Sequence, residues 1–147
     1  MKVTTRGRYG LRLLLEVALH QHIRPVTLAD VALRQGISQP YLWHVVNPLK
    51  AAGILLAKRG AHGGYVLGRN PSDITIREIL DVLEGDVSFV ASQQIQDEVQ
   101  NRVFRTAHQA WIELEKQIAE ILCGVTLEDL LMRYREGEDT DSLTYSI

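Results

Sequence analysis

Residues 27–53 carry the pattern that most limits how this chain can fold. Two short stretches typical of helices, Thr27 to Gln35 and Ser38 to Gly53, flank Gly36, and a small residue, Ala32, lies four positions before that glycine. Two helices that cross steeply need a small residue in the first helix and a turn residue that tolerates positive φ. Apolar residues also stand where the two helices would pack together, at Val31, Ile37, Leu42 and Val45. This spacing predicts a helix-turn-helix unit.

The flanking segments extend this unit to the plan of a winged helix. An apolar-rich helix is predicted over about residues 5–21, before Pro25. After Gly53, two short apolar strands, Ile54–Lys58 and Tyr65–Leu67, enclose a glycine-rich stretch that is typical of a hairpin tip. The predicted fold class is therefore mainly α, a winged helix-turn-helix with a small β-hairpin wing.

The charge of the chain is strongly uneven along its length. Residues 1–70 contain ten Lys and Arg residues against only Glu16 and Asp30, a net charge of +8, whereas residues 71–147 carry −10. A basic half joined to an acidic half suggests that one lobe meets a polyanion. Together with the helix-turn-helix spacing, the asymmetry favours double-stranded DNA as that polyanion, with a chance distribution over solvated faces as the alternative.

Candidate DNA contacts follow from how such a fold docks. The second helix of the unit enters the major groove, where outward side chains near its N-terminus reach base edges. The hairpin tip would lie along a neighbouring minor groove, where an arginine suits the narrow, electronegative space and glycines allow close backbone approach. Turn formation is the alternative role of those glycines, and helix capping is the first role expected of Ser38. The predicted DNA-binding residues are Arg6, Arg8, Ser38, Gln39, Tyr41, His44, Arg59, Gly60, His62 and Gly63.

The C-terminal half is predicted to be helical as well. Thr75 to Glu78 has the sequence of a capping box at the start of a helix that ends near Gly85. A loop over residues 86–96 precedes a long helix from about Asp97 to Cys123, and a short helix opens at Thr126. Apolar residues spaced by three and four along the long helix are typical of a helix–helix seam: Trp111, Leu114, Ile118, Ile121 and Val125.

This seam predicts a dimerisation helix, because two basic lobes need a two-fold axis to address a palindrome. Packing of the stripe within one chain is the alternative. The resulting division is a winged helix-turn-helix DNA-binding region (1–85), an effector loop with dimerisation helices (86–135), and a polar tail (136–147) predicted to be disordered.

Several of these motifs resemble the Rrf2 family of bacterial winged-helix regulators. The resemblance covers about residues 1–135, and its most specific parts are the Gly7-Arg8-Tyr9 start and the Arg59-Gly60 and Gly63-Gly64-Tyr65 wing. It implies homodimers that bind palindromic operators, with the long helix crossing its partner. Further matching stretches are Met1–Tyr9, Gln35–Ser38, Tyr41–Leu42, Pro48–Leu49, Gly53–Ile54 and residues 74–85.

The resemblance also implies an iron–sulfur cluster, which many family members bind through three cysteines. The matching positions in this chain hold Gln93, Val99 and Arg105, and none of these is a thiol, carboxylate or histidine. His108 lies where one branch of the family supplies a histidine ligand, but a cluster needs several thiolates. We therefore expect no cluster and no cofactor or metal, with His108 at the surface or in an interface. The single cysteine, Cys123, is expected to be a buried apolar residue, with a redox thiol as the alternative.

Other classes of function find little support. The sequence shows no paired carboxylates, nucleophile–base motif, phosphate loop or metal-ligand spacing, so we expect no enzyme. The apolar run Leu11–Leu19 contains Arg12 and Glu16, so no membrane partner is expected. We predict a cytoplasmic, homodimeric transcription regulator, a repressor, whose small-molecule or protein effector binds between the winged lobe and the long helix, around residues 86–96. The alternative is a regulator whose acidic C-terminal half binds a partner protein.

Overall fold

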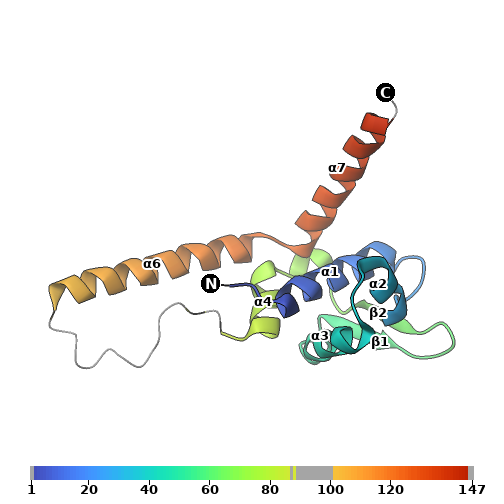
Figure 1. Cartoon of the computed structure of the whole chain (residues 1–147), viewed down its shortest axis with the longest axis horizontal. Coiled ribbons are helices and arrows are strands. Elements are labelled where there is room, and N and C mark those ends of the chain that lie inside the picture. Colours follow the sequence, from blue (N-terminus) through green and yellow to red (C-terminus); the bar gives the residue numbers. More distant parts are fainter. Residues whose placement is uncertain (1, 87, 89–100, 146–147) are drawn as a thin grey trace.

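The computed structural model describes residues 2–86, 88 and 101–145, and side chains up to residue 141. Helices α1 to α4 and a β-hairpin form one lobe, from which α6 extends as a long arm while α7 projects in another direction (Figure 1). We call the part from α1 to α4 the winged lobe. The elements are α1 (Thr5–His20), α2 (Leu28–Gln35), α3 (Gln39–Ala51), β1 (Leu55–Lys58), β2 (Gly64–Leu67), the 3-10 helix η1 (Pro71–Asp73), α4 (Ile76–Glu84), α6 (Arg102–Gly124) and α7 (Leu127–Tyr145).

The helices of the winged lobe begin at side-chain caps, as the sequence predicts. The hydroxyl of Thr27 accepts a hydrogen bond from the Asp30 amide (3.1 Å), and that of Ser38 accepts one from the Tyr41 amide (3.4 Å). Thr75 caps α4 in the same way, through the Glu78 amide (3.2 Å). The reciprocal half of the predicted capping box is absent from the described structure, because the Glu78 carboxylate pairs with Arg69 instead.

The turn between α2 and α3 has the predicted geometry. Gly36 ends α2 with φ 64°, a left-handed conformation that glycine adopts without steric cost. The four residues expected to lock the two helices together are all buried, with at most 4% of their surface exposed: Val31, Ile37, Leu42 and Val45. The helix-turn-helix unit is therefore confirmed down to its inter-helix core.

The wing is an antiparallel hairpin in which β1 pairs with β2, from Leu55 opposite Leu67 to Lys58 opposite Gly64. A further bridge joins Tyr65 to Val26, which anchors the hairpin to the segment before α2. Leu55, Tyr65 and Leu67 point into the core. The hairpin is thus anchored through Tyr65 of β2, while the tip between the strands extends away from the lobe (Figure 1).

The arm is attached to the winged lobe at the junction of α6 and α7. The Ile76 amide donates to the Val125 carbonyl (2.9 Å), and the Leu127 amide donates to the Ile74 carbonyl (2.8 Å). Leu127 is fully buried in the core of the lobe. These bonds fix the end of α6 against the start of α4, so the arm is attached directly to the winged lobe.

Two expectations for the C-terminal half are corrected. The long helix is described from Arg102 rather than from Asp97, and residues 97–100 lie outside the described residues. The tail from residue 136 is predicted to be disordered, but residues 136–145 are helical because α7 continues to Tyr145, and residues 146–147 lie outside the described residues. The polar composition of this segment did not predict a helix. Leu127 and Leu131, in the first turns of α7, are buried and anchor that helix to the lobe. Within the described part of the chain, no helix is long and apolar enough to cross a membrane.

Candidate nucleic-acid interface

The first turns of α3 present their polar side chains outward. Ser38, Gln39 and His44 are exposed, and Tyr41 is partly buried. Leu42 and Val45, on the opposite face of the helix, are fully buried. Because α3 packs by one face only, its other face presents Gln39 and His44, together with the half-exposed Trp43, to a groove.

The tip of the wing presents the exposed side chain of Arg59 beside glycines. Arg59, Gly60 and His62 are exposed, and Gly63 is partly covered. A Cβ atom on Gly63 would lie 3.0 Å from the Gly60 carbonyl oxygen and would also meet the Lys58 carbonyl, so this glycine is required by the turn itself. Gly60 has φ 113° and open space around it. The tip therefore combines a turn-forming glycine with an exposed arginine.

The start of α1 carries Arg6 and Arg8 on exposed positions, while its glycines pack inward. One oxygen of the Glu84 carboxylate accepts hydrogen bonds from the Gly7 amide (3.0 Å) and from the hydroxyl of Thr4 (2.8 Å). A Cβ on Gly7 would collide with that carboxylate. The end of α4 thus fixes the first turn of α1, which sequence patterns did not indicate.

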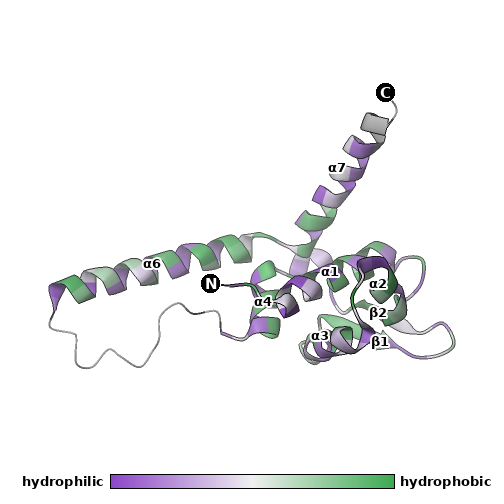
Figure 2. Ribbon diagram, viewed as in Figure 1, coloured by the Kyte–Doolittle hydropathy of each residue, from purple (hydrophilic) through white to green (hydrophobic). Residues whose placement is uncertain are grey.

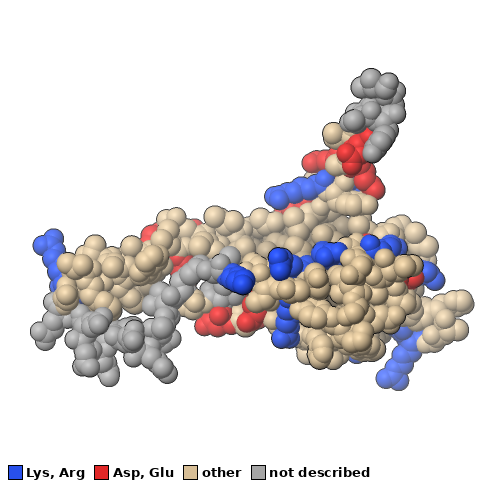
Figure 3. All heavy atoms as spheres, in the orientation of Figure 1, with Lys and Arg blue, Asp and Glu red and all other residues tan. Residues whose placement is uncertain are grey.

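Charge is distributed over the surface as the sequence predicts. On the face shown in Figure 3, basic side chains lie over the winged lobe and at the wing, and acidic side chains gather near α4 and along α7, with further basic side chains at the free end of α6 and on α7. The three groups of predicted DNA contacts all belong to the basic lobe. A surface with this polarity attracts a polyanion at one end of the molecule and repels it at the other.

A cluster of charged side chains that the sequence did not indicate lies between α1 and α2. Its centre is the Glu16 carboxylate, whose residue is only 7% exposed. Glu16 pairs with Arg34 Nε (3.0 Å) and accepts from Gln35 Nε2 (2.7 Å). A lone acidic residue inside an apolar helix is the one sequence signal that could have indicated this cluster, because buried carboxylates need partners.

The predicted dimerisation stripe is uncovered. Helix α6 has no buried residue among its 23, and its apolar side chains run along its length (Figure 2). Trp111, Leu114 and Ile121 are 57%, 46% and 66% exposed, and Ile118 is partly buried. Among the described residues, packing within one chain leaves Trp111, Leu114 and Ile121 largely uncovered, whereas Ile118 and Val125 are partly buried.

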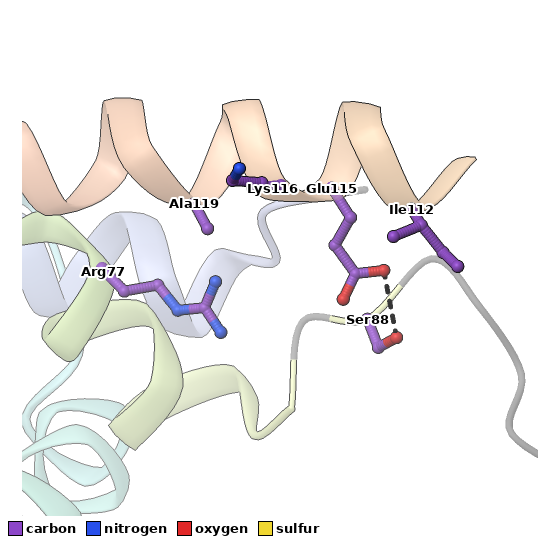
Figure 4. Close-up of a pocket in the computed structure, with 6 residues that line it drawn as sticks. All are labelled: Arg77, Ser88, Ile112, Glu115, Lys116 and Ala119. Atoms are coloured by element: carbon purple, nitrogen blue, oxygen red, sulfur yellow. Dashed lines mark hydrogen bonds between the residues drawn. The ribbon is translucent and has the colours of Figure 1, made fainter. Parts of the chain in front are cut away.

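A hollow of about 380 Å³ lies between α4 and α6, on a different side of α6 from the stripe. Figure 4 shows Arg77 reaching across from α4 toward Ala119, and Glu115 turned toward Ser88. The Arg77 Nε bonds Asp81 (2.8 Å), and this hydrogen bond raises the pKa of the guanidinium. With Lys116 also at the rim, the hollow has two cations and one carboxylate.

The residues near α6 do not fit an iron–sulfur cluster. His108 is partly buried and stacks on Phe104, with ring centroids 5.7 Å apart. Cys123 is exposed, so the expectation of a buried cysteine was wrong. It lies fifteen residues, or roughly 22 Å along the helix, from His108.

Of the three positions that match cluster cysteines in the family, Arg105 is exposed, and Gln93 and Val99 lie outside the described residues. One thiol per chain cannot supply the several thiolates that such clusters need, and the described residues include no group of three His, Cys, Asp or Glu suited to a metal ion.

The sequence matches the model of the Rrf2 family, described as an iron-dependent transcriptional regulator, over residues 3–133. The HTH-type transcriptional regulator CymR of Bacillus subtilis is 38% identical over 145 residues, which is 99% of each chain. The HTH-type transcriptional regulator IscR of Pectobacterium atrosepticum is 32% identical, over 97% of this chain and 89% of its own. These relatives are transcription regulators rather than enzymes.

Solved structures show the same likeness. The structure of CymR, the global cysteine regulator of B. subtilis, superposes with a TM-score of 0.75 at 36% identity, over 90% of this chain and 98% of that one. The structure of IscR from T. potens superposes with a TM-score of 0.74 at 36% identity, over 93% of this chain and 90% of its own. The winged helix-turn-helix predicted from the sequence is therefore confirmed, and DNA binding is favoured over a role limited to binding a partner protein.

Proposed function

Because this chain belongs to the Rrf2 family of DNA-binding transcription regulators, we propose that it acts as a homodimer that represses transcription from palindromic operators. The observation that carries the proposal is the uncovered apolar face of α6 beside a basic winged lobe. A 23-residue helix with no buried residue is not expected to remain unpartnered in water, because helical stability in proteins comes mostly from packing.

The geometry of α6 supports a seam between two copies. At about 100° per residue, positions 111, 114, 118 and 121 fall within roughly 80° on a helical wheel. The residues that line the hollow against α4 fall on a neighbouring face. One face of the arm therefore holds its own lobe, and another is available to the arm of a second copy.

Each lobe would then read one half-site of the operator. In this proposal the outward face of α3 contacts base edges through Gln39, Tyr41 and His44, and Arg59 enters the adjacent minor groove. Arg6 and Arg8 bind phosphates and set the orientation of the lobe. A bound dimer blocks access to the DNA that it covers, which is why repression is the expected sign.

The experiment that tests the proposal places charge in the seam. The double variant Leu114→Glu, Ile118→Glu should be a folded monomer in sedimentation, because a dimer would bury two unpaired carboxylates per chain. Its affinity for an operator selected from random DNA should fall at least about a hundredfold, while its thermal unfolding stays close to that of the parent. The matched control is Gln109→Glu, which lies on the opposite face of α6. A double variant that stays dimeric would contradict the proposed seam.

We also propose that an effector binds in the hollow between α4 and α6, since a ligand there would fix the angle of the arm to its lobe. Only a difference in affinity for two arm positions could change operator binding. Arg77 and Lys116 favour an anionic ligand. A screen of small carboxylates and inorganic phosphate by thermal shift should find a stabilising anion, and Lys116→Met should abolish the shift while Arg133→Met leaves it unchanged. A stabilising anion whose effect survives Lys116→Met would place the effector elsewhere.

A further inference from the structure

Arg12 joins α1 to the turn that precedes the recognition helix. Its Nε donates to the side-chain oxygen of Gln35 (2.9 Å), and its Nη2 donates to the Gln35 backbone carbonyl (2.6 Å). Gln35 is the last residue of α2, directly before Gly36. Its carbonyl is among the last four of the helix, which lack partners inside the helix. The planar guanidinium therefore completes the end of α2 with two hydrogen bonds in a fixed geometry.

The same guanidinium also lies over an aromatic ring that contacts α3. The carbon at its centre is 5.3 Å from the centroid of the Tyr9 ring. Tyr9 in turn meets Tyr41 edge-on, with ring centroids 5.2 Å apart and an interplanar angle of 77°. Such edge-to-face pairs have a preferred geometry, so each ring restricts the position of the other. Arg12 thus influences α3 in two ways. It holds Gln35, just before the turn into α3, and it holds Tyr9 of α1, which contacts Tyr41 in the first turn of α3.

The far side of this arrangement is fixed by the buried cluster. Gln35 Nε2 donates to Glu16 Oε1 (2.7 Å), and the other carboxylate oxygen pairs with Arg34 (3.0 Å). Glu16 Oε2 is also 3.3 Å from His20 Nδ1. Gln35 can therefore neither rotate away nor release Arg12 without leaving polar atoms of a largely buried group unpaired.

We infer that Arg12 is a positioning residue for DNA recognition, not one of the arginines that bind phosphate. It sets the pose of the first turn of α3, from Ser38 to Tyr41, where the predicted base contacts begin. The inference rests on the proposed role of α3 as the reading helix. Operator affinity depends on placing those side chains to within a fraction of an ångström, whereas non-specific affinity depends on charge alone.

The chemistry of Arg12 separates this role from a phosphate contact. Its side chain is only partly exposed, and the two nitrogens that donate to Gln35 are already engaged. A phosphate contact depends mainly on positive charge, so lysine would keep the salt dependence of DNA binding even where it loses the second hydrogen bond of the arginine fork. A positioning role needs the planar fork and the flat face over Tyr9, which lysine lacks.

The test compares Arg12→Lys with Arg12→Ala in the full-length protein. We expect both to lose roughly tenfold or more of the affinity for a selected operator, the scale of one good base contact. Affinity for random-sequence DNA should change less than about twofold in Arg12→Lys, and its salt slope should equal that of the parent. A parent-like Arg12→Lys, with an Arg12→Ala whose salt slope falls by about one, would show a phosphate contact and overturn the inference.

Tyr9 provides the second arm of the test. Tyr9→Phe keeps the ring and should bind the operator as tightly as the parent, whereas Tyr9→Leu should lose specificity as the Arg12 variants do. Thermal unfolding of each variant separates positioning from a general loss of fold, which would lower specific and non-specific affinity in parallel. The double variant Gln39→Ala, His44→Ala tests the proposed function separately, because both side chains are exposed on α3 and neither forms a hydrogen bond or ring contact with Arg12, Tyr9 or Gln35 among the described residues. Unchanged operator affinity in that variant would refute the reading role of α3 itself.

Discussion

Arg59 illustrates how the position of one side chain can indicate its use. It is exposed at the tip of the wing, and among the described residues it forms no ion pair. Arg12 and Arg34, by contrast, are held by Gln35 and Glu16 on the winged lobe, the first by hydrogen bonds and the second by an ion pair. Arginines with the same formal charge thus serve different purposes, and the exposed Arg59 at the wing tip is placed to enter a narrow minor groove.

Replacing Arg59 should therefore weaken DNA binding without weakening the fold. We expect Arg59→Ala to lose about 1–3 kcal/mol of operator binding, measured by fluorescence anisotropy, because one groove contact disappears. Its unfolding midpoint should match that of the parent. The control is Arg133→Ala on α7, which should leave both quantities unchanged. Full operator affinity in Arg59→Ala would mean that the wing does not contact the minor groove.

Iron should be dispensable to this chain, although its family is described as iron-dependent. Protein purified without oxygen is expected to be colourless, and a chelator should not change its operator affinity. Cys123→Ser should behave in the same way, because one exposed thiol far from His108 cannot hold a cluster. Stoichiometric iron with visible charge-transfer absorption in the anaerobic protein would contradict this expectation.

At the scale of elements, the contact between α1 and α4 sets where the recognition helix lies. Gly10 faces Leu83 so closely that a Cβ there would overlap the leucine side chain and approach Val45 Cγ1 to 3.2 Å. Gly10→Ala should cost about 1–3 kcal/mol in chemical unfolding, because α1 must move away from the core. Gly137→Ala on exposed α7 should instead stabilise, since alanine favours a helix by about 0.5–1 kcal/mol over glycine. A neutral Gly10→Ala would show that α1 can shift freely.

Elements with local signals could be predicted from the sequence, and contacts between distant elements could not. Thr27, Gly36 and Ser38 act within one helical turn, so their spacing alone located α2 and α3. The Glu84 bonds to the start of α1 join residues almost eighty positions apart, and no local pattern announces them. The C-terminal part of α7 was not predicted for a related reason. Its polar composition is typical of a disordered tail, and the helix is anchored by Leu127 and Leu131, which are buried against distant elements.

At the scale of the whole molecule, the separation of charge should govern how the regulator meets DNA. A dimer that places Arg6, Arg8 and Arg59 of both chains on phosphates or in grooves would displace about six counterions, for a slope of log K against log[salt] near −5. The monomeric Leu114→Glu, Ile118→Glu variant should show about half that slope. A flat salt dependence in the parent would mean that the basic lobe does not face DNA.

The most direct test of the whole account is selection of binding sites from random double-stranded DNA by the purified full-length protein. Two lobes joined across α6 should enrich an inverted repeat whose half-sites lie about one or two helical turns apart, each bound by one chain of a dimer. The Leu114→Glu, Ile118→Glu variant should not enrich that repeat. Recovery of no preferred sequence, or of a single half-site bound equally well by parent and variant, would contradict a dimeric reader of palindromic DNA.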